Sequence, residues 1–426
     1  MSLRKRGKTV PSVLIAAILI LCFAGVYAQA AETITVYGPW PDVADTIRDL
    51  YNQFTAQTGI KVKWEPAQTD FPSHVTKITT LLSSGDGSYD VIWLDDQIVC
   101  NAGKAGWLEP LEGKYALPKG YLDDWPAGVV HDSAYVNGKL YRVIGQVEAM
   151  WTFYRKDLYK KAGVAPPATW DELVQVGKKL TSGEGGAGKR WGLLISGQKG
   201  GMLSNELTLY MLQAGGSSID YSLPGSKVAL QFMYDLVYKH HIAPESSFAT
   251  DYNLAAEGFK KGIWATWFTW QGFYSVFKSD KQFIADAPID DKVGVTRALK
   301  GPANDYTISG SWGWTINKFS RHKNAALKFI LFLSSVDAQK AWAKAGRPPA
   351  RLSVMKDSEL WKVNPPNKLW SDYGSTVRGR PLMTVPRTNE VMEAQEDWAH
   401  KFLTGQVDIN TALTQGDKAM KAIMKE

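Results

Sequence analysis

"YDVIWLDD", residues 89–96, is the stretch that decides the fold. Its centre, Val91 to Leu94, is apolar without interruption, as in a strand that is buried on both faces. Upstream, residues 32–37 and 60–64 have the composition of strands, and the apolar residues between 47 and 54 recur with the period of one helix face. A further helical segment covers residues 75–82. This alternation of strands and helices predicts an α/β fold in which helices flank a mostly parallel sheet.

A second α/β unit begins near residue 148. The stretch "ATWDEL", residues 168–173, contains a helix capping box, because Glu172 follows Thr169 at the required spacing. Helical periodicity returns at residues 207–212, 228–237 and 326–333, and strand patterns at 293–296 and 312–316. No long linker separates the two units. We therefore expect two domains, between which the chain crosses more than once.

The N-terminus predicts export. Four basic residues within positions 4–8 precede an apolar run over residues 13–26, and Ala28-Gln29-Ala30 offers the small residues that a signal peptidase reads. The alternative is an uncleaved anchor, but the run is shorter than the about 20 residues that span a bilayer. We expect residues 1–30 to be a cleaved signal peptide. Its removal leaves 396 of the 426 residues, too many for one ordinary core.

Charge and composition exclude several functions. Without residues 1–30 the chain has 45 Lys and Arg against 42 Asp and Glu, a net charge of +3, and no long basic run, so nucleic acid is not an expected partner. Cys100 is then the one remaining cysteine, which favours a buried side chain over a disulfide or a nucleophile. The histidines show no metal-ligand spacing, and no acyl-transfer triad is recognisable. We expect no catalytic residues, no metal and no cofactor.

Three acids and several tryptophans are candidates for ligand binding. Asp95 and Asp96 follow a strand at its C-terminal end, where open parallel sheets bind ligands, although either could equally cap a helix. Glu148 interrupts an apolar run, so it is either paired within the fold or directed at a cleft. The chain contains 17 tryptophans, and some stand at predicted strand ends or turns; an indole can cover the apolar face of a sugar while acids bind its hydroxyls. The alternative is that these rings fill the core.

Five ordered segments resemble the extracellular solute-binding proteins of bacterial ABC importers, in particular the sugar-binding cluster that includes the maltose- and trehalose-binding proteins. The segments are "YDVIWLDDQIVCNAGKAGWLEPLE" from residue 89, "NGKLYRV…EAMWTFYRKDLYKKAGVAPPATWDEL" from 137, "FKKGIWATWFTWQGFY" from 259, "SGSWGWTINKFSRHKNAALKFILFLSS" from 309 and "GRPPARLSV" from 346. Together they extend over nearly all of the chain after the signal peptide. Thr266 and Ser311 depart from the family pattern.

The resemblance implies a two-lobed periplasmic binding protein fold with about three hinge crossings, near residues 145, 292 and 348. One lobe would comprise residues 31–145 and 293–347, and the other residues 146–292 and 348–426. Carried over onto this sequence, the family's ligand contacts fall on seven residues. These are Trp40, Asp95, Asp96, Glu148, Trp270, Trp312 and Arg351.

The function that the resemblance implies is transport without catalysis. A monomer in the periplasm would bind a mono- or oligosaccharide between its lobes, close around it by hinge bending and deliver it to an ABC permease in the inner membrane. Two alternatives stay open. One is a secreted glycoside hydrolase that uses two of Asp95, Asp96 and Glu148, and the other is the same fold binding a polyol phosphate.

Overall fold

The computed structural model describes residues 32–68, 71–183, 188–385 and 387–425. The predicted signal peptide, residues 1–30, lies outside these ranges. Within them, no helix combines the length and the apolar character needed to cross a membrane.

Eight strands form one sheet, in which the order is β2-β1-β3-β9-β6-β7, with β10 beside β9 and β8 beside β6. Their bounds are β1 Thr33–Tyr37, β2 Lys61–Glu65, β3 Val91–Asp95, β6 Arg142–Arg155, β7 Thr266–Trp270, β8 Val293–Thr296, β9 Thr307–Ile316 and β10 Val377–Arg378. A separate hairpin pairs β4 (Tyr135–Val136) with β5 (Lys139–Leu140).

The sheet is mixed, whereas the sequence predicts mostly parallel pairing. β1 pairs in parallel with β2 and β3, and β10 with β9, but every pairing that joins β6 to β7, β8 or β9, or β3 to β9, is antiparallel. The reason is that β6 and β9 are long strands that cross the molecule in opposite directions. The parallel β-α-β-α-β unit that the sequence predicts is present in β1, β2 and β3.

These two crossing strands define two lobes. The first lobe is built on β1, β2 and β3, and it meets β9 at residues 312–316. The second lobe is built on β7 and β8, which pair with β6 between residues 150 and 155. Residues 142–149 of β6 pair with β9 between the lobes. Two segments of sheet, joined through shared strands, thus form the two-lobed architecture that the sequence predicts.

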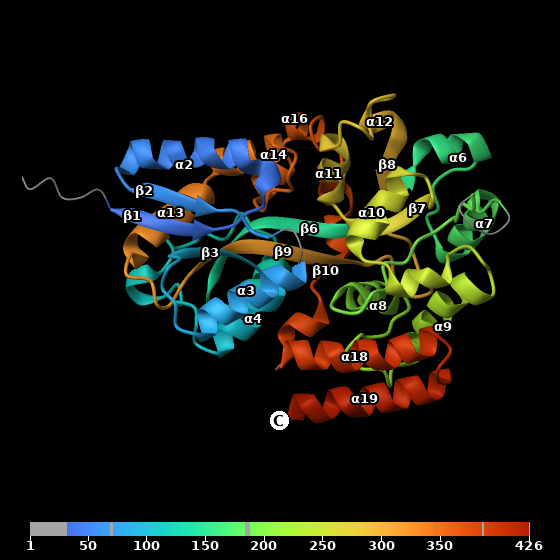
Figure 1. Ribbon diagram of the computed structural model, residues 1–426. Helices are drawn as coiled ribbons and strands as arrows, with labels where there is room; N and C mark the ends of the chain where they lie inside the picture. Colours follow the sequence, from blue (N-terminus) through green and yellow to red (C-terminus); the bar gives the residue numbers. More distant parts are fainter. Residues whose placement is uncertain (1–31, 69–70, 184–187, 386, 426) are drawn as a thin grey trace, which may run out of the picture.

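Helices cover both faces of each lobe (Figure 1). In the view of Figure 1, α2 lies above the sheet of the first lobe and α3 and α4 lie below it, while α10 and α11 lie above α8 and α18 in the second lobe. The helix bounds are α2 Ala44–Thr58, α3 Phe71–Ser83, α4 Asp96–Lys104, α5 Ala127–Ala134, α6 Lys156–Ala162, α7 Trp170–Leu180, α8 Met202–Gln213, α9 Pro224–Tyr238, α10 Tyr252–Lys260, α11 Phe273–Ser279, α12 Ile289–Lys292, α13 Lys323–Leu333, α14 Val336–Lys344, α15 Leu352–Met355, α16 Ser358–Trp361, α17 Asn367–Tyr373, α18 Thr388–Leu403 and α19 Ile409–Lys425.

Local signals explain the best-predicted helices. α2 ends at Gly59, which has a left-handed φ of 73° that costs glycine little. Half of the predicted capping box before α7 forms, since Thr169 accepts a hydrogen bond from the amide of Glu172 at 3.2 Å, while the Glu172 carboxylate accepts from the amide of Ala168, one residue before the N-cap. Large apolar cores then hold the helices to the sheet: one extends from α2 and α13 across to α11, and another joins α8, α9, α18 and α19. Cys100 is buried and carries no disulfide.

A third connection supports the two crossing strands. The side-chain amide of Gln339, on α14, donates to the carbonyl oxygen of Gly145 at 2.9 Å and accepts from the amide of Ala350 at 2.7 Å. Gly145 lies at an irregularity of β6, where the register with β9 shifts. Gln339 therefore ties the first crossing, in β6, to the segment that leads from α14 into the remainder of the chain.

Candidate functional site

Two tryptophans meet beside β3: Trp40, which follows β1, and Trp312, on β9. The rings of Trp40 and Trp312 are half-buried, and their centroids lie 4.5 Å apart at an interplanar angle of 73°. The guanidinium of Arg347 lies 5.2 Å from the centroid of the Trp40 ring, and the His74 ring meets Trp312 edge-on at 5.5 Å. Aromatic rings and a cation thus line one side of the region between the lobes.

Glu148 stands at the centre of this region. It is a register partner of Gly310 in the pairing of β6 with β9, so its side chain leaves the sheet between the lobes. Its carboxylate accepts hydrogen bonds from the amide of Gly272 at 2.9 Å and from the side chain of Gln146. Burial raises the pKa of Glu148, while the Gly272 amide and the charge of Arg347 act in the opposite direction. The acid is buried and paired within the fold, within electrostatic reach of Arg347.

Trp270 forms the second-lobe side. It is the last residue of β7 and half-buried, and its indole Nε1 donates to the hydroxyl of Tyr252 at 3.0 Å. The backbone of β9 approaches the ring so closely that a Cβ on Gly310 would lie 3.0 Å from it. A larger residue at position 310 would displace the indole, so this glycine helps to position Trp270.

Asp95 and Asp96 lie where β3 meets α4, and both are buried. Asp95 accepts from the amide of Ile98 at 3.0 Å, as a helix N-cap, and is the register partner of Trp312. Asp96 forms an ion pair with Arg380, whose guanidinium lies 5.7 Å from the Trp270 ring. Burial raises the pKa of Asp95, and the charge of Asp96 raises it further, whereas Arg380 lowers it.

Contacts therefore connect six of the seven predicted residues in one interlobe cluster. We use this name for Trp40, Asp95, Asp96, Glu148, Trp270 and Trp312 together with Arg347 and Arg380. The cluster combines half-exposed indoles, carboxylates and guanidinium groups, which can hold the apolar C–H faces and the hydroxyl groups of a polyhydroxylated molecule. Their binding role stays a prediction.

Arg351 does not belong to the cluster. Its Nη1 donates to Asp124 at 3.1 Å, its Nε donates to the carbonyl oxygen of Ser334 at 2.6 Å, and its guanidinium stacks on Trp125 at 4.2 Å. These partners belong to the first lobe. The neighbouring Arg347 takes the position near Trp40 and Glu148 instead.

The sequence does not predict three residues that contact this cluster or belong to it: Arg347, Arg380 and Tyr252. Arg380 follows β10, whose pairing with β9 places it between the lobes, and nothing in its local pattern distinguishes it from a surface arginine. Arg347 could have been proposed from the sequence. It immediately precedes Pro348 in the same "GRPPARLSV" segment in which the resemblance implies Arg351.

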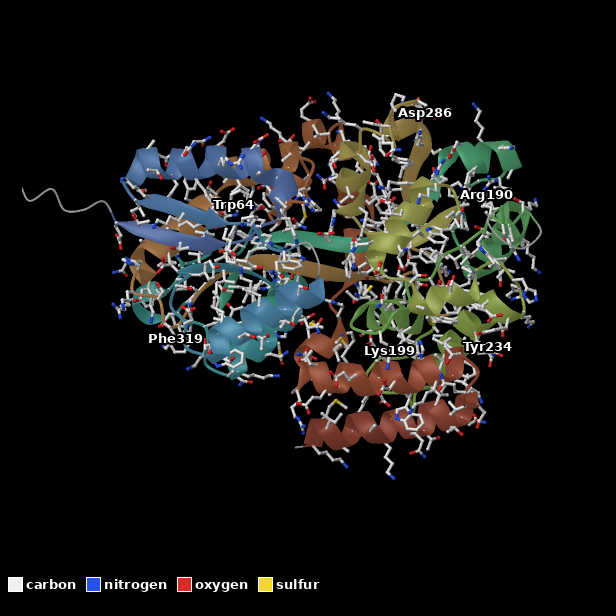
Figure 2. All side chains as sticks on the ribbon, viewed as in Figure 1. Trp64, Arg190, Lys199, Tyr234, Asp286 and Phe319 are labelled. Carbon is white, nitrogen blue, oxygen red and sulfur yellow. The ribbon has the colours of Figure 1, made fainter. Side chains whose placement is uncertain are left out.

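A hollow lies at the end of the first-lobe strands that is opposite to the interlobe cluster. It has a volume of about 390 Å³, and the residues lining it include Thr33, Asp90 and Arg321 but no predicted site residue. Phe319, another of its lining residues, lies on the outer side of the first lobe in Figure 2, away from the second lobe. The described part of the chain contains no group of three or more His, Cys, Asp and Glu side chains arranged to hold a metal ion.

Comparisons with known proteins identify the family and the fold. Residues 40–340 match the family described as bacterial extracellular solute-binding protein. A mannitol-binding protein of Pseudomonas aeruginosa is 27% identical over 431 residues, covering 93% of this chain and 94% of that protein. A probable amino-acid ABC transporter periplasmic-binding protein of Sinorhizobium fredii is 27% identical over 333 residues, covering 75% and 73%. The structure of maltose-bound MalE3 from T. maritima has 30% identity and a TM-score of 0.79, covering 92% of this chain and 100% of that one.

Proposed function

The chain belongs to the family of bacterial extracellular solute-binding proteins, in the cluster that resembles maltose-binding proteins, and we propose that it binds a neutral sugar or sugar alcohol between its lobes. Its relatives are binding components of ABC transporters and not enzymes. The class of ligand that this chain binds, and the residues that bind it, are our proposal.

The observation that carries the proposal is the composition of the interlobe cluster. Of the acids in the cluster, Asp96 is paired with Arg380, and Glu148 lies within electrostatic reach of Arg347. Counted with the neighbouring Arg142, whose charge also acts on Asp95, the three acids of the cluster face three arginines. A site whose charges are balanced in this way suits an uncharged ligand, because the ligand then needs no counter-charge. The half-buried rings of Trp270 and Trp312 supply apolar surface from different lobes. The relatives that bind mannitol and maltose support this ligand class.

Transport follows from closure around the ligand. We propose that the lobes rotate about the crossings in β6 and β9 and the segment near residue 348. Because β8 pairs with the second-lobe part of β6, we place the second crossing within β9 and not near residue 292. In this proposal a monomer, released into the periplasm by cleavage after residue 30, delivers the sugar to a permease in the inner membrane.

The hydrolase alternative is less well supported. It requires two carboxyl groups free to act on a glycosidic bond. Asp95 caps α4, Asp96 is held by Arg380, and Glu148 accepts hydrogen bonds from Gly272 and Gln146, so all three candidate acids already have partners in the protein. Incubation with maltose and trehalose, followed by analysis of the products, tests this alternative; turnover would contradict the transport proposal.

A thermal-shift screen tests the ligand class. The panel consists of D-mannitol, D-glucitol, ribitol, D-glucose, maltose and trehalose, with L-glutamate and L-leucine for comparison. A ligand at about 100 times its Kd adds about 2.7 kcal/mol to the stability of the folded state, so a true ligand raises the Tm measurably. We expect at least one neutral compound to raise it and to bind in a 1:1 ratio by calorimetry. A response to the amino acids alone would contradict the proposal.

A further inference from the structure

Two arginines face two aspartates where the first lobe meets the second. Arg142 is buried beside the pair, where its Nη1 donates to the carbonyl oxygens of Leu94 and Ser311 at 3.2 and 3.1 Å. The charges of both Arg380 and Arg142 lower the pKa of Asp95, which places all four groups within electrostatic reach of one another. The formal charges of this group, two cations and two carboxylates, sum to zero.

Arg380 is the member that reaches both lobes. Its Nη2 binds Asp96 at the start of α4, and its Nη1 donates to the Oδ1 of Asn205, on α8, at 2.9 Å. Its guanidinium also lies beside Trp270. Its Nε is buried and has no hydrogen-bond partner among the described residues. Arg380 therefore has a buried N–H that no group of the described residues accepts, while Asp96 and Asn205 each accept from one of its terminal nitrogens.

An arginine whose guanidinium N–H groups are free is a preferred partner of phosphate and carboxylate groups, which it binds through two parallel hydrogen bonds. Here Asp96 and Asn205 occupy both terminal nitrogens of Arg380. A second anion brought to this position would also approach the carboxylates of Asp95 and Asp96, and like charges in a buried site repel each other.

We propose that Asp96, by neutralising Arg380, makes the site select uncharged polyhydroxylated ligands over anionic ones such as sugar phosphates and sugar acids. This inference rests on the proposed function and refines it. Asp96 is thus a specificity-determining residue. Its removal leaves the Arg380 charge available and converts the same site into one that accepts an anion.

The experiment compares neutral and anionic forms of one carbon skeleton. Calorimetry measures Kd for D-mannitol and D-mannitol 1-phosphate, and for D-glucitol, D-glucitol 6-phosphate and D-gluconate. The proteins are the wild type, Asp96→Asn and the double variant Asp96→Asn/Arg380→Gln, in which both charges are removed. The matched control is Asp124→Asn, because Asp124 pairs with Arg351 in the first lobe, outside the interlobe cluster.

We expect the wild type to prefer the neutral compound. Asp96→Asn should shift the ratio of the two Kd values toward the anion by at least about tenfold, the size of one charge-assisted hydrogen bond. The double variant should return the ratio toward the wild-type value, and Asp124→Asn should leave it unchanged. Circular dichroism spectra and melting curves establish that each variant is folded, and Asp96→Ser, which removes the same charge, takes the place of Asp96→Asn if that variant is too unstable.

Three outcomes would overturn the inference. The wild type could bind a phosphate or acid more tightly than its neutral counterpart, Asp96→Asn could leave the ratio unchanged, or the double variant could keep the anion preference. Each of these leaves the proposed solute-binding function intact. Failure of the wild type to bind any neutral compound of the screening panel would instead contradict the proposed function itself, and the inference with it.

Discussion

The carboxylate of Glu148 accepts a hydrogen bond of 2.9 Å from the backbone amide of Gly272. This bond joins the long strand β6 to the turn that follows β7, two residues after Trp270. It fixes the position of the Glu148 carboxylate relative to the Trp270 indole, which lies on β7, the strand paired with β6.

Replacing Glu148 by glutamine should weaken binding. The amide keeps the size of the side chain but removes the charge that faces Arg347, so we expect Kd to rise about 30-fold or more, in the range for a buried charged partner. Calorimetry with the ligand from the thermal-shift screen measures the change. Glu172→Gln is the control, because Glu172 also accepts a backbone hydrogen bond, from Ala168, but lies outside the interlobe cluster. Equal effects of the two substitutions would contradict a binding role for Glu148.

Replacing Trp270 by alanine should raise Kd by at least about tenfold, because the ligand loses an aromatic surface. The control is Trp398→Ala, which removes another half-buried indole, one covered by Lys401 on α18. Melting curves and calorimetry are recorded for both variants. If Trp270 is a core residue, its variant will lose melting temperature while the affinity of the folded fraction stays at the wild-type value.

The sequence predicts the β1-β2-β3 unit and its helices well, because buried strands and amphipathic helices leave local patterns. It does not predict the antiparallel insertion of β9 between β3 and β6, since these pairings join residues that are more than 150 positions apart. Trp40, Trp270 and Trp312 could be proposed from their places at predicted strand ends or turns, although β9 begins five residues before Trp312. Arg380 could not, because its position depends on the long-range pairing of β10 with β9.

The crossing in β6 should not tolerate a side chain at position 145. A Cβ on Gly145 would lie 2.5 Å from the ring of Trp93 and 2.9 Å from the indole nitrogen of Trp314. Gly145→Ala should therefore destabilise the fold by about 1–3 kcal/mol, as overpacking does in other cores. Gly128→Ala is the control, since a Cβ there meets no atom within 4 Å and α5 gains helix propensity. Chemical denaturation measures both; an unchanged free energy of unfolding for Gly145→Ala would refute the packing argument.

Stability should depend on pH through Glu206, a fully buried acid on α8. Its Oε1 accepts from the amide of Ser196 at 3.1 Å, its Oε2 has no partner among the described residues, and burial raises its pKa from 4.5 to about 8. In the unfolded chain Glu206 ionises near its ordinary pKa, whereas in the folded protein it stays protonated until about pH 8. The unfolded state therefore binds fewer protons between these values, and stability falls as pH rises through this window.

Glu206→Gln removes this titration, so the melting temperature of the variant relative to the wild type should increase from pH 5 to pH 9. Scanning calorimetry of both proteins over that range measures the difference. A difference that does not change with pH would show that Glu206 does not titrate in this window.

A crystal structure of the protein with the neutral sugar or sugar alcohol that binds most tightly tests the central claim most directly. The account predicts one ligand molecule between the lobes, in contact with Trp270 or Arg380 on one side and with Trp312 or Trp40 on the other, with its hydroxyl groups bound by Glu148. A ligand that occupies the hollow beside Thr33 and Arg321, or that touches residues of one lobe alone, would contradict the account.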